Sequence, residues 1–140
     1  MSKQFYPDVP TISSGQAHSS LADSPNPTVI HFLDQPIAFH RCFVTITGSI
    51  TAALMLSQAL YWQHCCKDPE GWWWKTLEEW IEETGLNRRE LSLARRKLQL
   101  LGILDEKRTR TPAKLWYRLN LVALSDAVAG VTRLFPNNGL

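Results

Sequence analysis

The chain has 140 residues, 44% of them apolar and six of them Trp, with a formal net charge of +2. This length favours a single domain with a hydrophobic core and spare length for a tail. There is no run of about eighteen apolar residues and no apolar region typical of a secretory signal. We therefore expect a cytoplasmic protein without a membrane partner.

The charge is unevenly distributed along the chain. Residues 86–120 hold ten basic and three acidic residues, a net charge of +7, whereas the remainder holds five basic and ten acidic residues. Neutralisation of phosphates by Lys and Arg supplies much of the affinity of proteins for DNA. The partner favoured by the sequence is therefore double-stranded DNA, and no small-molecule substrate is expected.

The first clear element is a core helix. Residues 29–47 fit neither helical nor strand periodicity, and a helix over 38–46 that ends at Gly48 is favoured over a pair of strands. Ser49 then caps a helix over 50–62. Its apolar residues lie on more than one side, which is typical of a central core helix.

The three cysteines are expected to be free thiols. They cannot all pair with one another, and Cys65 is adjacent to Cys66. With His64 these two could bind zinc, but the second CxxC or HxxxH half of a structural zinc site is missing. We expect neither a metal nor a cofactor.

Trp72, Trp73 and Trp74 are consecutive. Such rings could stack on nucleic-acid bases. A short strand whose alternate side chains pack on opposite faces is the commoner arrangement and is favoured here. One of the three rings is expected to stay partly exposed.

Two capping boxes begin two successive helices. Thr76 with Glu79 forms the first, and Asn87 with Glu90 forms the second. Gly85 between them supplies a left-handed helix end, so the pair is predicted to be a helix-turn-helix. The first helix is expected to turn four carboxylates outward: Glu78, Glu79, Glu82 and Glu83. The second is expected to bury Leu91, Ala94, Leu98 and Leu101.

Gly102 ends the second helix, and a hairpin is expected after it. Its strands are predicted over 103–107 and 115–121, joined by a polar basic loop over 108–114. With residues 72–74 as a short first strand, this order is that of a winged helix. The predicted fold class is mainly α with a small β-hairpin (α+β), a winged helix-turn-helix with a flexible N-terminal arm.

Three segments are predicted. Residues 1–28 are rich in Pro and Ser and poor in apolar residues, which favours the flexible arm. Residues 29–121 form the winged-helix domain. Residues 122–140 form a C-terminal helix and a frayed tail; the helix is predicted over 121–134 with Ser125 as its cap.

In a winged helix the second helix of the pair enters the major groove. The exposed side of this helix is predicted to display Arg89, Ser92, Arg96 and Gln99; Arg suits guanine, Gln suits adenine and Ser suits either. Base-edge or nearby phosphate contacts are predicted for Arg89, Ser92 and Arg96. Arg88, Arg95 and Lys97 flank them, Arg88 and Lys97 as phosphate contacts. On the wing, backbone phosphates or the minor groove are predicted to meet Arg108, Arg110 and Lys114. A homodimer is expected, because groove readers commonly bind two half-sites.

A protein-interaction module that binds a host factor is the alternative, because four carboxylates on the preceding helix would repel DNA. Its surface would consist of Glu78, Glu79, Glu82, Glu83 and Trp73. The sequence contains no Walker loop, no GxSxG and no carboxylate pair near a His, so an enzyme is not predicted.

Three strings carry a resemblance to a known family: TGSITAALMLSQALYWQ (47–63), DPEGWWWKTLEEWIEETGLNRRELSLARRKLQLLGIL (68–104) and PAKLWYRLN (112–120). The chain resembles winged-helix proteins of phages and other mobile elements, replication-associated or uncharacterised, over roughly residues 37–121. The resemblance implies a role in replication initiation or in transcriptional control of a mobile element. It also fits a phage-borne inhibitor of host replication or defence machinery.

Overall fold

The computed structural model describes residues 36–37 and 39–134, and the arm predicted over 1–28 lies outside them. Within these residues the chain forms five α-helices and one three-stranded antiparallel sheet. The coarse prediction, mainly α with a small β element, is confirmed. None of the helices in this part of the chain has the length and apolar character needed to cross a membrane.

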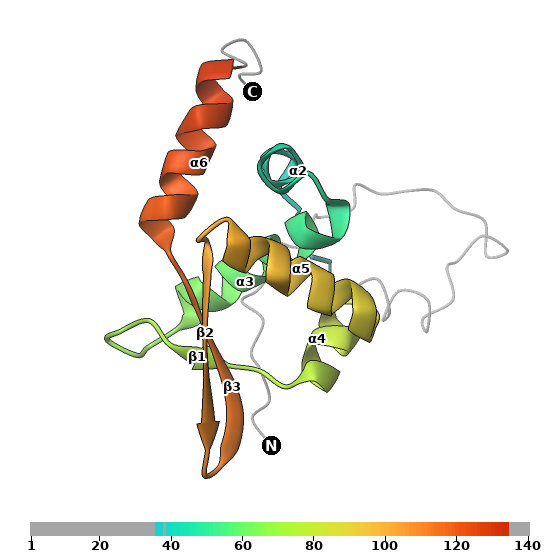
Figure 1. The fold of residues 1–140 in the computed structure, drawn as a ribbon, viewed down its shortest axis with the longest axis vertical. Coiled ribbons are helices and arrows are strands. Elements are labelled where there is room, and N and C mark those ends of the chain that lie inside the picture. The colour runs from blue at the N-terminus through green and yellow to red at the C-terminus, as the bar shows by residue number, and fades with distance from the viewer. Residues whose placement is uncertain (1–35, 38, 135–140) are drawn as a thin grey trace, which may run out of the picture. The chain divides into compact units, whose positions relative to one another are not determined.

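Figure 1 shows the elements in chain order. They are α2 (Arg41–Thr47), α3 (Ile50–Cys65), β1 (Trp73–Trp74), α4 (Leu77–Thr84), α5 (Arg88–Leu100), β2 (Leu104–Arg110), β3 (Ala113–Leu119) and α6 (Leu121–Leu134). The helix predicted over 38–46 is therefore α2, and the core helix extends three residues beyond its predicted end at Trp62.

Local sequence signals set most helix ends. Ser49 Oγ accepts a hydrogen bond from the Ala52 amide at the start of α3. Both predicted capping boxes are present, at Thr76 for α4 and at Asn87 for α5. Gly85 ends α4 with φ of 72°, a left-handed conformation that costs Gly little.

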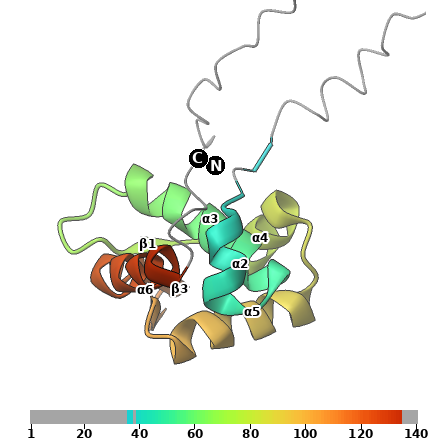
Figure 2. The same cartoon turned by 90° about the horizontal axis from the view of Figure 1, so that it is seen from above.

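Helix α3 is the centre of the core, as its composition predicts. Its consecutive residues 55–59 are all buried, so the helix is covered on more than one side. It packs against α2 and α5 (Figure 2) and also reaches β3. A surface helix carries charged residues on the side that faces water. Because α3 is covered on more than one side, it carries no charged residue from Ile50 to Gln63.

The sheet has the strand order β1-β3-β2; β3 packs against α3, β2 packs against α5, and rings of β1 and β3 contact α4. The face toward these helices is buried. It includes Trp73 and Tyr117, whose rings stack with centroids 5.1 Å apart. Trp80 of α4 meets both rings at 5.9 and 5.7 Å. These three aromatic residues join the sheet to α4.

A single amide links the sheet to α3. Gln63 Oε1 accepts hydrogen bonds from Trp73 Nε1 (3.0 Å) and from the Leu119 amide (2.8 Å). Its Nε2 donates to the Gly71 carbonyl at 2.9 Å. The position of β1 and β3 relative to the core helix is therefore fixed by hydrogen bonds as well as by packing.

Three local predictions are wrong. The residues predicted as a loop over 108–114 lie mostly in the strands, and only Thr111 and Pro112 form the turn, through a cis peptide bond. Ser125 lies inside α6, whose first turn is instead capped by Asn120 Oδ1, which accepts from the Ala123 amide. Leu101 is 43% exposed rather than buried, because α5 ends at Leu100.

Candidate nucleic-acid interface

Helix α5 turns a basic side to solvent. The buried residues Leu91, Ala94 and Leu98 hold the opposite side against the core, as predicted. The exposed polar side chains, called here the α5 face, are Arg88, Arg89, Ser92, Arg96, Lys97 and Gln99. Glu90 is the helix's own carboxylate and is occupied by the capping box.

The α5 face has one weak ionic contact with α4. Arg88 lies 3.5 Å from a Glu78 oxygen, and both side chains are about three-quarters exposed (73% and 74%). Such a pair is screened by water and salt and contributes little to stability. Arg88 therefore keeps its charge available to an anionic partner.

Arg95 does not belong to this face, contrary to the prediction. Its Nε and one terminal nitrogen both donate to the Glu106 carboxylate at 2.6 Å. The two side chains are mostly buried (26% and 10% exposed), so this two-bond contact joins α5 to β2. A guanidinium paired in this way contributes to the contact between α5 and β2 rather than to the α5 face.

The wing residues lie on strands rather than on a loop. Arg108 and Arg110 are exposed near the end of β2, where Arg110 pairs with Ala113 across the turn. Lys114 is the second residue of β3, and its ammonium lies 3.9 Å from the centre of the Trp74 ring. The tip of the hairpin is therefore basic, as predicted, and better ordered than a loop would be.

The outer face of the sheet was missed as a candidate site. On β3 it carries Trp116 and Arg118, and on β2 it carries Lys107 opposite Trp116. Lys107 lies 4.2 Å from the Trp72 ring centre, and the Arg118 guanidinium lies 4.5 Å from it. Aromatic or basic residues occupy every second position in residues 72–74 and 114–118, and this pattern is a signal from which the face could have been predicted.

Two residues of the predicted protein-interaction surface are buried. Trp73 is 7% exposed and packs in the aromatic cluster, whereas Trp74 is the exposed ring of the three. The Glu83 side chain is 8% exposed and forms an ion pair with Lys75. Glu79 serves the capping box and is half-buried, so only Glu78 and Glu82 project fully from α4.

Glu83 is the centre of a buried polar network. Besides Lys75, it accepts hydrogen bonds from Gln58 Nε2 (2.8 Å) and Trp62 Nε1 (2.9 Å). Burial lowers the pKa of Lys75 below its usual 10.5, while Glu83 acts in the opposite direction. The Lys75 ammonium also lies 4.1 Å from the centre of the Trp62 ring. These four groups connect α3 to α4.

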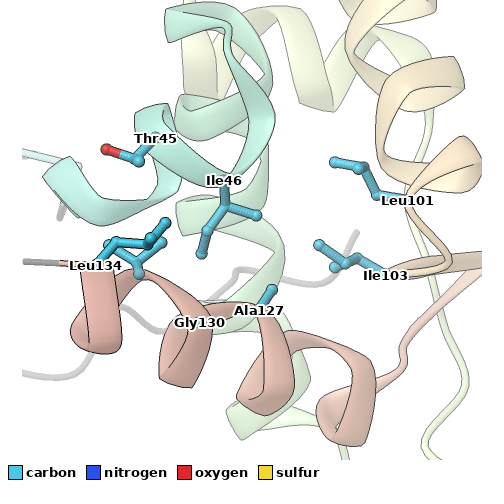
Figure 3. A pocket seen from close by; sticks show the side chains of 8 residues that line it. Thr45, Ile46, Leu101, Ile103, Ala127, Gly130 and Leu134 are labelled. Carbon is cyan, nitrogen blue, oxygen red and sulfur yellow. The ribbon is translucent and has the colours of Figure 1, made fainter.

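A pocket of about 330 Å³ lies between α2, α6 and the turn that precedes β2 (Figure 3). Apart from the hydroxyl of Thr45, its lining side chains are apolar, including Ile46 of α2, Ile103 and Leu134 of α6. The exposed Leu101 lies at its edge. A pocket without titratable groups offers apolar contact and no acid, base or nucleophile.

The cysteines and histidines of the described residues form no cluster suited to a metal ion. Cys65 is exposed, and the Cys66 thiol donates to the Trp72 carbonyl. The structure therefore adds no support for the zinc alternative.

Comparisons with known proteins returned no match: none among protein-family models, none among curated proteins and none among solved structures.

Proposed function

We propose that this chain is a winged-helix protein that binds double-stranded DNA, with α5 in the major groove and the β2–β3 hairpin on the adjacent backbone. The observation that carries the proposal is the α5 face. Of its four cations, only Arg88 forms an ion pair among the described residues, with the solvent-exposed Glu78 carboxylate 3.5 Å away. A helix of this kind offers both phosphate contacts and donors for base edges.

Within this proposal the residues divide by position. Arg89, Ser92, Arg96 and Gln99 lie on one side of α5 at helical spacing and contact base edges. Arg88 and Lys97 flank them and contact phosphates, as do Arg108 and Arg110 at the hairpin end. Arg95 is not among these DNA contacts, because it forms an ion pair with Glu106.

The proposed biological setting rests on the resemblance to winged-helix proteins of mobile elements. We propose a cytoplasmic protein that acts in replication initiation or in transcriptional control of such an element. Recognition of one duplex site is the property that either role needs, so both lead to the same first experiment.

We further propose that the protein binds DNA as a homodimer. Support comes from exposed apolar side chains on α5 and α6: Leu93, Leu100, Leu121, Val122 and Leu134, which are 50–79% exposed. Exposed apolar side chains of this kind are available for contact between two protomers.

The alternative, a module that binds a host protein through α4, has less support. Burial of Trp73 and Glu83 leaves Glu78 and Glu82 as its fully exposed members. Two separate carboxylates form a small surface in comparison with the basic one on α5 and the hairpin.

Two double variants test the proposal. Arg89→Ala with Arg96→Ala is expected to weaken binding to the selected duplex by at least about thirtyfold and to lower discrimination against random sequence. Arg108→Ala with Arg110→Ala is expected to weaken binding to all duplexes alike and to reduce the salt dependence. Equal losses from both pairs on selected and random DNA would overturn the assignment of α5 to the groove.

A further inference from the structure

The outer face of the sheet combines aromatic rings with positive charge. We call it the tryptophan face and define it by Trp72, Trp74, Trp116, Lys107, Lys114 and Arg118. The strand register places Trp74 directly opposite Trp116, and Lys107 opposite Trp116 on the other side. The face therefore continues across all three strands.

Core packing does not account for these three rings. The buried side of the sheet already holds the cluster of Trp73, Trp80 and Tyr117. Trp74 is 40% exposed, and Trp72 and Trp116 are half-buried. The solvent side of an antiparallel sheet is usually polar, so three Trp there point to a role outside the core.

The charge of the face favours an anionic partner. Lys107 and Lys114 each lie within 6.0 Å of two ring centres, and Arg118 lies 4.5 Å from the Trp72 ring. Two carboxylates lie beside these cations: Asp105 is paired with Arg118 at 3.0 Å, and Asp68 accepts a hydrogen bond from the Trp72 amide at 2.9 Å. Neither Lys107 nor Lys114 forms an ion pair within the part of the chain that the structure describes, so both ammonium groups are available to phosphates.

We propose that the tryptophan face binds single-stranded DNA, with bases stacked on Trp74 and Trp116 and the backbone phosphates on Lys107 and Lys114. In a duplex the flat faces of the bases are already stacked on one another, and a protein meets their edges and the phosphates. Trp rings on an exposed sheet instead suit unpaired bases, whose π-faces are open. The proposal concerns a surface distinct from the α5 face and does not depend on it.

The cations that now lie over the rings do not prevent stacking. An exposed contact between a cation and a ring corresponds to about a two- to fivefold preference. Stacking of a base on an aromatic ring corresponds to about a five- to 150-fold gain in affinity. A base can therefore displace a Lys from a ring, and the displaced ammonium then meets the neighbouring phosphate.

Fluorescence anisotropy with a labelled oligothymidine of about twelve nucleotides tests the proposal in about 50 mM salt. Trp74→Leu and Trp116→Leu are each expected to weaken binding at least fivefold and to leave duplex affinity unchanged. Trp74→Phe keeps an aromatic ring and is expected to retain most of the affinity. The matched control, Arg89→Ala with Arg96→Ala on α5, is expected to bind the oligothymidine as the wild type does.

A measurement on the wild-type chain avoids any effect of substitution on folding. Irradiation with an oligonucleotide that contains 5-bromodeoxyuridine is expected to cross-link peptides that contain Trp74 or Trp116. Absence of oligothymidine binding, cross-links confined to α5, or Trp74→Leu binding as tightly as the wild type would overturn the proposal. An equal loss of duplex and single-strand binding in the Trp variants would also overturn it, because it would make the face a duplex contact.

Discussion

Substitution of Glu83 by Gln is expected to remove a large part of the stability of this domain. The change keeps the shape of the side chain and deletes the negative charge beside Lys75, whose side chain is 0% exposed. Loss of one partner from a buried ion pair typically costs about 3–5 kcal/mol, because the other charge stays buried without compensation. The free energy of unfolding of domains of this size is about 5–15 kcal/mol, so the loss is about a fifth of the total or more.

Urea denaturation followed by Trp fluorescence measures the effect. With an m-value of about 2 kcal/mol/M, the midpoint is expected to fall by about 2 M. Glu82→Gln, an exposed neighbour on α4, serves as the control and is expected to change stability by less than about 0.5 kcal/mol.

A second variant separates the lost charge from the lost shape. Lys75→Met combined with Glu83→Gln removes both charges, and the amide oxygen at position 83 can still accept from Trp62 Nε1. This double variant is expected to be more stable than Glu83→Gln alone. If Glu83→Gln unfolds at the same urea concentration as Glu82→Gln, or if the double variant is the less stable of the two, the reasoning about the buried pair is wrong.

Three further variants give distinct outcomes. Asn87→Ala removes the side-chain cap of α5 and is expected to cost about 1 kcal/mol of unfolding free energy in the same urea assay, and no loss would contradict the cap. Arg95→Met is expected to cost about 1–3 kcal/mol by breaking the contact with Glu106, yet to leave duplex affinity in an anisotropy titration within about twofold; a larger loss of affinity would return Arg95 to the interface. The pKa of Lys75 is lowered in the folded protein, so between that pKa and 10.5 the unfolded chain binds more protons than the folded one. The free energy of unfolding therefore rises with pH in that window, and Lys75→Met is expected to abolish the rise. The titration is kept below pH 10.0, because burial raises the pKa of Tyr117 above that value and its ionisation at higher pH lowers the free energy of unfolding. If stability still rises with pH in Lys75→Met, the rise comes from another titratable group.

The elements that sequence predicted well are those set by local signals. The capping boxes at Thr76 and Asn87 join residues three positions apart, and Gly85 ends α4 by its own backbone freedom. Such signals act within one helical turn, so they can be identified without knowledge of the fold. The order of helices and strands followed from them.

The errors arose where long-range contacts decide the outcome. Glu83 has the spacing of a surface residue on α4, but Gln58 and Trp62, more than twenty positions away, bring donors to it. Arg95 meets Glu106 only because the hairpin folds back along α5. Neither partner can be identified from helical periodicity, which describes one element at a time.

The hairpin was predicted too short for a different reason. Residues 108–111 are all polar, because this end of β2 carries exposed and half-buried side chains only. Alternation of apolar and polar residues marks a strand only while one of its faces is buried. The same effect conceals the tryptophan face, because its residues fall in separate predicted segments: Trp72 and Trp74 in the short strand, Lys107, Trp116 and Arg118 in the hairpin strands, and Lys114 in the loop.

The most direct test of duplex recognition is binding of the whole chain to a pool of random duplexes at about 50 and 200 mM salt, with sequencing of the retained DNA. The proposal predicts an affinity that falls steeply with salt and an enriched motif, palindromic if the protein binds as a dimer. Weak binding that is insensitive to salt, with no sequence enriched in the retained fraction, would contradict it.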